Sequence, residues 1–157
     1  MAKPKDSKAI CFIEPTEELK ERLTAEEFAV LVENATEPPF QNKFWDNHEA
    51  GIYVDAIDGT PLFASCAKFD SGSGWPSFWS PIDEQRLSLR EDLSFGMRRT
   101  EVRAAASGGH LGHLFEDGPK PSGLRYCINS AALRFVPLAD LEAEGYGELR
   151  QLFTTGH

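Results

Sequence analysis

The sequence predicts a mainly β, single-domain protein with a few peripheral helices. Its 157 residues fit one domain and suffice to bury a hydrophobic core without disulfides. Short segments rich in aromatic and β-branched residues recur along the chain, and turn signals such as Asp58-Gly59 separate them. The sequence contains no internal repeat that would indicate a solenoid or a propeller.

Composition indicates a soluble globular protein. Hydrophobic residues make up 41% of the chain, mean hydropathy is -0.37, and no apolar run approaches the roughly 20 residues of a membrane span. The net charge of -9 disfavours nucleic acid, because phosphate binding needs clustered Lys and Arg. Three cysteines and a start without the apolar core of a secretory signal favour a cytoplasmic location with reduced thiols.

Helices are predicted near both ends of the chain. Residues 1–22 form an N-terminal arm, after which Thr24 and Glu27 match a capping box that opens a short amphipathic helix over residues 25–33. A final acidic helix is predicted over residues 138–153 from its approximate leucine stripe. Between them, strand-like segments cover residues 40–57, 61–65, 97–102, 123–130 and 131–136.

The strand around Cys127 is the first candidate for chemistry. Alternation places Arg125, Cys127 and Asn129 on one face of this strand. A thiol is nucleophilic as the thiolate, and a nearby arginine favours that form. The same pattern also fits a half-buried strand in which Cys127 is a small buried hydrophobic residue.

Two further segments present reactive or aromatic groups. His110 and His113 would lie on opposite faces of a regular strand, but the flanking glycines favour a bend that brings both imidazoles to one cleft. The two histidines alone are an incomplete zinc site, and a purely structural pair is the alternative. Trp75 lies in a glycine-rich loop, where its ring either contacts a ligand or fills the core.

Taken together, these segments resemble the methionine-R-sulfoxide reductases, the MsrB family, from about Leu23 to Phe135. The resemblance implies two antiparallel sheets with a cleft, a catalytic domain over residues 23–137 and a C-terminal helical extension over residues 138–157. It is carried by the ordered motifs Thr36-Glu-Pro-Pro-Phe40, Lys68-Phe-Asp-Ser-Gly72, Gly74-Trp-Pro-Ser-Phe78, His110-Leu-Gly-His113, Asp117-Gly-Pro119 and Arg125-Tyr-Cys-Ile-Asn-Ser130.

The resemblance also implies a reaction and a role for each residue. The substrate is R-methionine sulfoxide in oxidised proteins or peptides, and Cys127 is the nucleophile that becomes a sulfenic acid. The residues expected to supply protons, charge and orientation are His110, His113, Arg125 and Asn129. Those expected to bind the substrate are Trp75 and Phe78. We expect a monomer that is recycled by thioredoxin or a similar dithiol.

The chain departs from the family pattern at two places. Many relatives carry a resolving cysteine at the position of Ser73, so Cys66, or as second choice Cys11, is the candidate resolver, and an external thiol is the alternative. Many relatives also bind a structural zinc through two CxxC pairs, whose positions here are Asp55, Asp58, Ala104 and Ser107. Because these residues lack thiolates, we expect no structural zinc and no other cofactor.

Two other functions remain compatible with the same residue types. A cysteine hydrolase would use Cys127, a histidine and Asn129 as nucleophile, base and orienting residue. A non-catalytic relative would bind oxidised methionine as a recognition module. Acyl-enzyme formation would favour the first alternative, and undiminished repair by a Cys127→Ser variant would favour the second.

Overall fold

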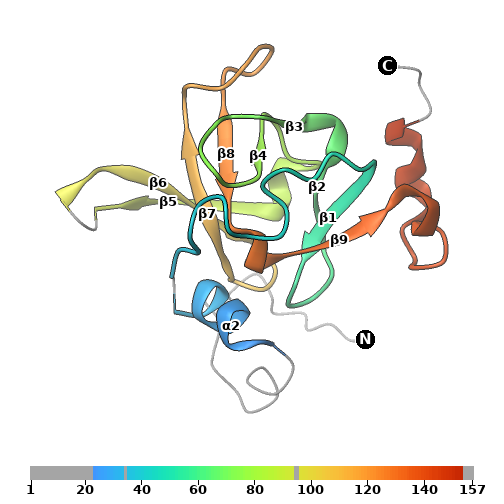
Figure 1. The fold of residues 1–157 in the computed structure, drawn as a ribbon, viewed down its shortest axis with the longest axis horizontal. Helices are drawn as coiled ribbons and strands as arrows, with labels where there is room; N and C mark the ends of the chain where they lie inside the picture. The colour runs from blue at the N-terminus through green and yellow to red at the C-terminus, as the bar shows by residue number, and fades with distance from the viewer. Residues whose placement is uncertain (1–22, 34, 94–95, 154–157) are drawn as a thin grey trace.

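The computed structural model describes residues 23–33, 35–93 and 96–153, which form two antiparallel sheets (Figure 1). A three-stranded sheet has the order β2-β1-β9, and a six-stranded sheet has the order β3-β4-β8-β7-β6-β5. The predicted mainly β fold with two antiparallel sheets is confirmed. The strands are β1 (Gly51–Asp55), β2 (Pro61–Ala64), β3 (Lys68–Phe69), β4 (Ser77–Phe78), β5 (Leu87–Asp92), β6 (Arg99–Ala104), β7 (His110–Phe115), β8 (Arg125–Ile128) and β9 (Leu133–Pro137).

The hydrophobic core is built largely from aromatic rings. Tyr53 on β1 packs edge-on against Phe78 on β4, with ring centroids 5.2 Å apart. Phe63 on β2 stacks on the same Phe78 ring at 4.4 Å. These three side chains are fully buried and join residues of both sheets into one cluster. The core therefore holds the two sheets together and leaves the opposite face of the six-stranded sheet available for a site.

Two stretches of the chain differ from the predicted strands. Within residues 40–57, β1 (Gly51–Asp55) is the one strand, and residues 39–46 form turns and bends. Strand β5 (Leu87–Asp92) was not predicted because its leucines are interspersed with charged residues and its middle is exposed. In Figure 1 the β5–β6 hairpin projects from the body of the molecule, which explains why β5 lacks the apolar signature of a core strand.

Helix α2 (Ala25–Leu31) has the predicted capping box. The Thr24 hydroxyl accepts a hydrogen bond from the backbone N–H of Glu27, and the Glu27 carboxylate accepts one from the backbone N–H of Thr24. The helix ends two residues earlier than predicted. It packs on the short 3₁₀ turn η5 (Ser130–Ala132) and on β7.

The continuous C-terminal helix predicted over residues 138–153 is wrong. Two 3₁₀ segments, η6 (Leu138–Asp140) and η7 (Gly147–Phe153), are separated by turns. Gly145 lies between them with a positive φ of 92°, a backbone conformation that a helix does not contain. The segment nevertheless packs tightly, because Leu141 is fully buried in a second cluster beside the three-stranded sheet.

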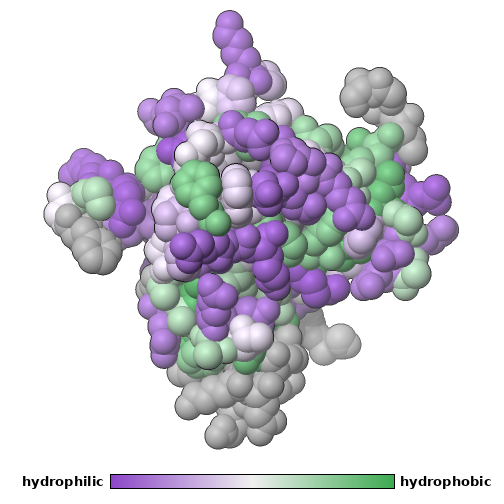
Figure 2. Space-filling model, viewed as in Figure 1, coloured by the Kyte–Doolittle hydropathy of each residue, from purple (hydrophilic) through white to green (hydrophobic). Residues whose placement is uncertain are grey.

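Hydrophilic residues cover much of the face shown in Figure 2, and hydrophobic residues gather toward the C-terminal segment. In the described part of the chain, no helix has the length and apolarity needed to cross a bilayer.

Candidate active site

The two histidines lie on a strand, and a β-bulge brings them to one face. The predicted bend at this position is wrong, since His110 and His113 both belong to β7. His113 is paired with Glu101 of β6, and His110 is paired with Arg103, two residues further along. Because the pairing shifts between Val102 and Arg103, three steps on β7 match two steps on β6. The imidazoles therefore share a face, with ring centroids 5.6 Å apart.

A cavity of about 200 Å³ opens on this face of the six-stranded sheet. Cys127 of β8 is the cross-strand neighbour of His113, and both side chains line the cavity. The loop between β3 and β4 contributes Trp75. The cavity is lined by Thr36, Ser73, Trp75, Arg99, Gly112, His113, Phe115, Arg125, Cys127, Ile128 and Asn129. Most of the predicted site residues are thus brought together.

The thiol of Cys127 is partly buried beside hydroxyl groups and a cation. Its Sγ atom lies 3.9 Å from the Oγ atom of Ser73. Burial raises the pKa of the Cys127 thiol, while hydrogen bonding by Ser73 and the charge of Arg125 act in the opposite direction. Gly112 permits this arrangement, because a Cβ atom there would lie 2.0 Å from the carbonyl oxygen of Cys127.

Arg125 is held in place by two partners. Its Nε atom lies 2.9 Å from Oδ1 of the exposed Asp117. Its guanidinium lies over the ring of Phe115, 4.4 Å from the ring centroid, and its positive charge lowers the pKa of Cys127. The guanidinium can therefore stabilise negative charge on the sulfur without leaving its position.

His113 is hydrogen-bonded to a carboxylate from the projecting hairpin. Its Nε2 atom lies 2.8 Å from Oδ2 of Asp92, the last residue of β5. Arg99 of β6 approaches the same carboxylate oxygen at 3.5 Å. Burial lowers the pKa of His113, and the hydrogen bond to Asp92 opposes that effect. The imidazole is thus fixed by one nitrogen while its ring borders the cavity.

His110 has a similar partner but does not line the cavity. It is almost completely buried, and its Nδ1 atom lies 2.7 Å from Oε2 of Glu101. Arg103 forms an ion pair with the same oxygen at 3.0 Å. The Nε2 atom of His110 has no hydrogen-bond partner among the described residues. His110 is therefore more deeply buried than His113, and the two rings meet edge-on.

Glu37 connects Trp75 to Asn129. The indole Nε1 of Trp75 donates to the backbone carbonyl of Glu37 at 3.0 Å, and the backbone N–H of Glu37 donates to Oδ1 of Asn129 at 3.1 Å. The buried Glu37 carboxylate accepts hydrogen bonds from the backbone N–H groups of Ser130 and Ala131. One residue thus holds the indole and the amide on two sides of the cavity.

Besides His110, the predicted residues Phe78 and Cys66 do not line the cavity. Phe78 is fully buried in the aromatic core. Cys66 is exposed in the 3₁₀ turn before β3, and β3 lies two strand spacings from β8, about 9–10 Å. A disulfide needs Cα atoms within about 7 Å, so a bond between Cys66 and Cys127 would require backbone movement. Cys11 lies outside the described residues.

The corner at which relatives hold zinc does not fit that metal here. The hydroxyl of Ser107 donates to Oδ2 of Asp55 at 2.6 Å, and Ala104 has no ligating atom. Burial and the neighbouring Asp58 raise the pKa of Asp55 to about 7. Within the described residues, no group of three or more His, Cys, Asp or Glu could hold a metal ion. A hydrogen-bonded carboxyl and hydroxyl link this corner instead.

The carboxylates and arginines around the histidines were not predicted from the sequence. Arg99, Glu101 and Arg103 alternate with less polar residues on β6, which is the signal that could have placed three charged groups on one strand face. Asp92 carries no comparable local signal, because its position follows from the pairing of β5 with β6.

The arrangement brings together a thiol, an imidazole and an indole ring. The hydrolase alternative would need Asn129 to orient a histidine, but its amide hydrogen-bonds the backbone of Glu37 and Leu111. The histidines are oriented by carboxylates instead. The site therefore suits attack by sulfur on an electrophilic centre next to a group that needs a proton.

A family model described as the SelR domain matches residues 23–137 of the chain. This range contains both sheets, Cys127, the two histidines and Trp75.

Proposed function

The chain belongs to the SelR (MsrB) family, and from this premise we propose that it reduces the R epimer of methionine sulfoxide in proteins and peptides. One observation carries the proposal: the thiol of Cys127, the imidazole of His113 and the indole of Trp75 border the same cavity. A sulfoxide requires these three groups, a nucleophile for its sulfur, a proton source for its oxygen and an apolar surface for its methyl group.

In the reduction step, Cys127 takes the oxygen of the sulfoxide. The S–O bond of the substrate breaks and a new S–O bond forms at the Cys127 sulfur. The substrate sulfur gains two electrons and the Cys127 sulfur loses two, so that the products are methionine and a sulfenic acid. The thiol proton of Cys127 is the proton that the transferred oxygen finally carries, and the step is balanced.

Both pKa shifts in the cavity set the protonation states from which this proton route starts. The pKa of Cys127 is raised by burial and that of His113 is lowered by burial, so the free protein at neutral pH holds a thiol beside a neutral imidazole. As Cys127 attacks, the imidazole passes the thiol proton to the sulfoxide oxygen. Arg125 stabilises the negative charge that develops on sulfur during the transfer.

The size of the cavity fits one side chain. Its volume of about 200 Å³ is below the roughly 300–1,000 Å³ of pockets that bind drug-sized ligands. The methyl group of the sulfoxide packs on Trp75, whose ring is held by its bond to Glu37. The rest of the protein substrate remains outside the cavity.

An external dithiol such as thioredoxin then reduces the sulfenic acid. Its first thiol displaces water and forms a mixed disulfide with Cys127, and its second thiol releases Cys127 as the free thiol. The hydroxyl of Ser73 lies 3.9 Å from the sulfur and cannot form a disulfide. Cys66 remains a candidate resolver that requires the backbone movement described above.

A single-turnover experiment tests the proposal. The prereduced protein is mixed with a peptide containing R-methionine sulfoxide and no added reductant, and methionine is quantified by mass spectrometry. Wild type should form methionine together with a dimedone-trapped sulfenic acid on Cys127, and Cys127→Ser should form neither. Cys66→Ser is the matched control and should complete the same first turnover.

Two results would contradict the proposal. The first is reduction by Cys127→Ser at the wild-type rate, which would indicate that the sulfur is not the oxygen acceptor. The second is an acyl adduct on Cys127 with an ester substrate and no reduction of sulfoxide, which would favour the hydrolase. Loss of the intramolecular crosslink in Cys66→Ser after turnover would identify Cys66 as the resolver.

A further inference from the structure

We propose that Asp92, held by Arg99, is the positioning residue that sets the tautomer and the proton affinity of His113. The inference rests on the proposed function, because it concerns the imidazole that passes a proton to the sulfoxide. Asp92 does not line the cavity and acts through the ring of His113.

The pairing of three strands places these groups in contact. Asp92 at the end of β5 is the cross-strand neighbour of Arg99 at the start of β6. The Asp92 carboxylate reaches Nε2 of His113 on β7, at 2.8 Å, while Arg99 approaches the same carboxylate oxygen at 3.5 Å. All three side chains are at least three-quarters buried, so solvent screens their interaction less than it screens a surface pair.

The hydrogen bond selects one tautomer of the imidazole. Carboxylates accept hydrogen bonds, so Nε2 of His113 carries the proton that it donates to Asp92. The Nδ1 atom is then the nitrogen that remains to exchange a proton with the substrate. His110 uses the opposite nitrogen, because its Nδ1 faces Glu101. The two imidazoles are therefore fixed in opposite orientations by separate carboxylates.

Charged and titratable groups surround His113 on four strands. Asp92 on β5 is the carboxylate in direct contact, and its hydrogen bond raises the pKa of the imidazole. Arg99 and His110 lower that pKa by charge repulsion. The cross-strand neighbours of His113 are Glu101 on β6 and Cys127 on β8, and Arg125 lies beside Cys127. Asp92 and Arg99 thus act in opposite directions on one ring.

Two substitutions test this opposition. Asp92→Asn removes the negative charge and should move the midpoint of the His113 titration to lower pH. Arg99→Gln removes the positive charge and should move the midpoint to higher pH. Nitrogen-15 NMR of the imidazole measures both the midpoint and the tautomer, and the wild type should show the proton on Nε2. A purely structural role would not shift the two variants in opposite directions.

Kinetics provide a second measurement. Asp92→Asn should slow the single-turnover reduction, within the roughly 10²–10⁴-fold that general acid catalysis contributes, while KM changes little. The limb of the pH profile that belongs to His113 should move in the same direction as the NMR midpoint.

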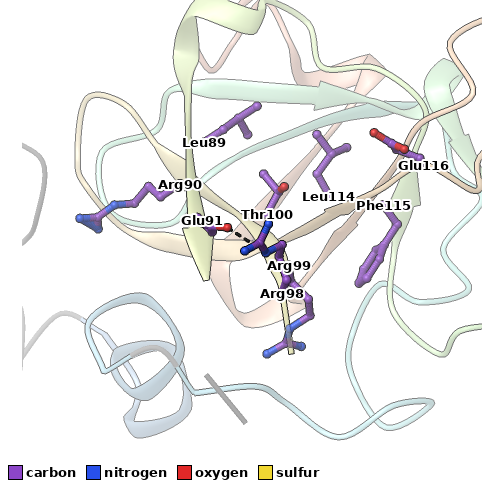
Figure 3. Close-up of a pocket in the computed structure, with 9 residues that line it drawn as sticks. All are labelled: Leu89, Arg90, Glu91, Arg98, Arg99, Thr100, Leu114, Phe115 and Glu116. Carbon is purple, nitrogen blue, oxygen red and sulfur yellow. Dashed lines mark ion pairs between the residues drawn. The ribbon is translucent and has the colours of Figure 1, made fainter. Parts of the chain in front are cut away.

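Glu91→Gln is the matched control. Glu91 precedes Asp92 in the chain, and its carboxylate forms an ion pair with Arg98 at 3.1 Å on an exposed surface. Figure 3 shows this pair in the groove formed by β5, β6 and the end of β7. The control should keep the wild-type midpoint and rate.

The proposal is overturned if Asp92→Asn keeps both the wild-type midpoint and the Nε2–H tautomer, or if Arg99→Gln moves the midpoint to lower pH. Either variant alone suffices for the test if the other does not fold. The NMR measurement needs no turnover, so its outcome is independent of the proposed function. If wild type fails to reduce sulfoxide but the two midpoints move apart as expected, the proposed function is wrong and the positioning of His113 by Asp92 stands.

Discussion

The surroundings of a single sulfur decide which later steps are available to this protein. A chain of hydroxyl groups lies near Cys127. The hydroxyl of Ser71 is hydrogen-bonded to those of Ser73 and Ser77, each at 2.8 Å. Hydroxyls can donate hydrogen bonds to a thiolate and so lower the pKa of Cys127, as Ser73 and Ser77 do. They cannot resolve a sulfenic acid. These residues therefore support the proposed reduction of the sulfoxide by Cys127, and another thiol must reduce the sulfenic acid.

Phe78 provides a prediction at the same scale. Because its ring is fully buried between Tyr53 and Phe63, Phe78→Leu should lower the free energy of unfolding by about 1–3 kcal/mol and leave KM unchanged. Trp75→Leu removes a ring that lines the cavity and should raise KM. Urea denaturation and steady-state kinetics measure the two effects. A raised KM in Phe78→Leu without loss of stability would restore Phe78 as a substrate contact.

At the scale of elements, the bulge in β7 is what assembles the site. Without the extra residue, His110 and His113 would lie on opposite faces of the strand, as regular alternation requires. With it, both rings face the carboxylates of Glu101 and Asp92. The capping box of α2 and the hairpin of β5 and β6 depend on residues that are close in the sequence. The bulge instead depends on how β7 pairs with β6.

Gly112, next to the bulge, gives the element-scale prediction. A Cβ atom there would lie 2.0 Å from the backbone carbonyl oxygen of Cys127, so Gly112→Ala must displace β7 from β8. We expect a loss of about 3 kcal/mol in the free energy of unfolding, the upper end for adding an atom to a packed interior, and a large loss of activity. Gly123→Ala is the control: its Cβ meets no atom within 4 Å and only its φ of 73° is unfavourable, which costs about 1–2 kcal/mol. Equal losses in the two variants would show that contact with β8 is not the cause.

At the scale of the whole molecule, one buried carboxyl joins the two sheets. Asp55 ends β1 in the three-stranded sheet, and its partner Ser107 follows β6 in the six-stranded sheet. The pKa of Asp55 is raised from 3.8 to about 7, by burial first and by Asp58 second. The folded protein therefore keeps this carboxyl protonated at pH values where the unfolded chain has lost the proton.

This difference predicts a pH dependence of stability. A carboxyl with a raised pKa in the folded state contributes stability that is fully present below about pH 4 and is lost as the pH rises through about 7. Asp55→Asn should remain neutral, so its unfolding free energy relative to wild type should increase from pH 4 to pH 7 and then stay constant. Chemical denaturation at a series of pH values measures it. Asp140→Asn, at an exposed carboxylate, is the control and should show no such increase. If the unfolding free energy of Asp55→Asn relative to wild type did not change with pH, the raised pKa of Asp55 would be contradicted.

Features whose causes are local could be predicted from the amino-acid sequence. The capping box at Thr24 and Glu27 depends on residues three apart, and the strand at Cys127 follows from alternation within a few positions. The motifs around Cys127, His110, His113 and Trp75 likewise identified the family and five of the eleven residues that line the cavity.

The contacts between these local features and residues far away in the chain could be seen only in the folded protein. In the fold, Asp92 is hydrogen-bonded to His113, Ser107 is hydrogen-bonded to Asp55, and Phe78 is buried in the core. Each of these contacts depends on the register or packing of strands far apart in the chain, and a shift of one residue in register moves a side chain to the other face of its sheet. Alternation within one strand cannot specify that register, because it is set by the combined packing of both sheets.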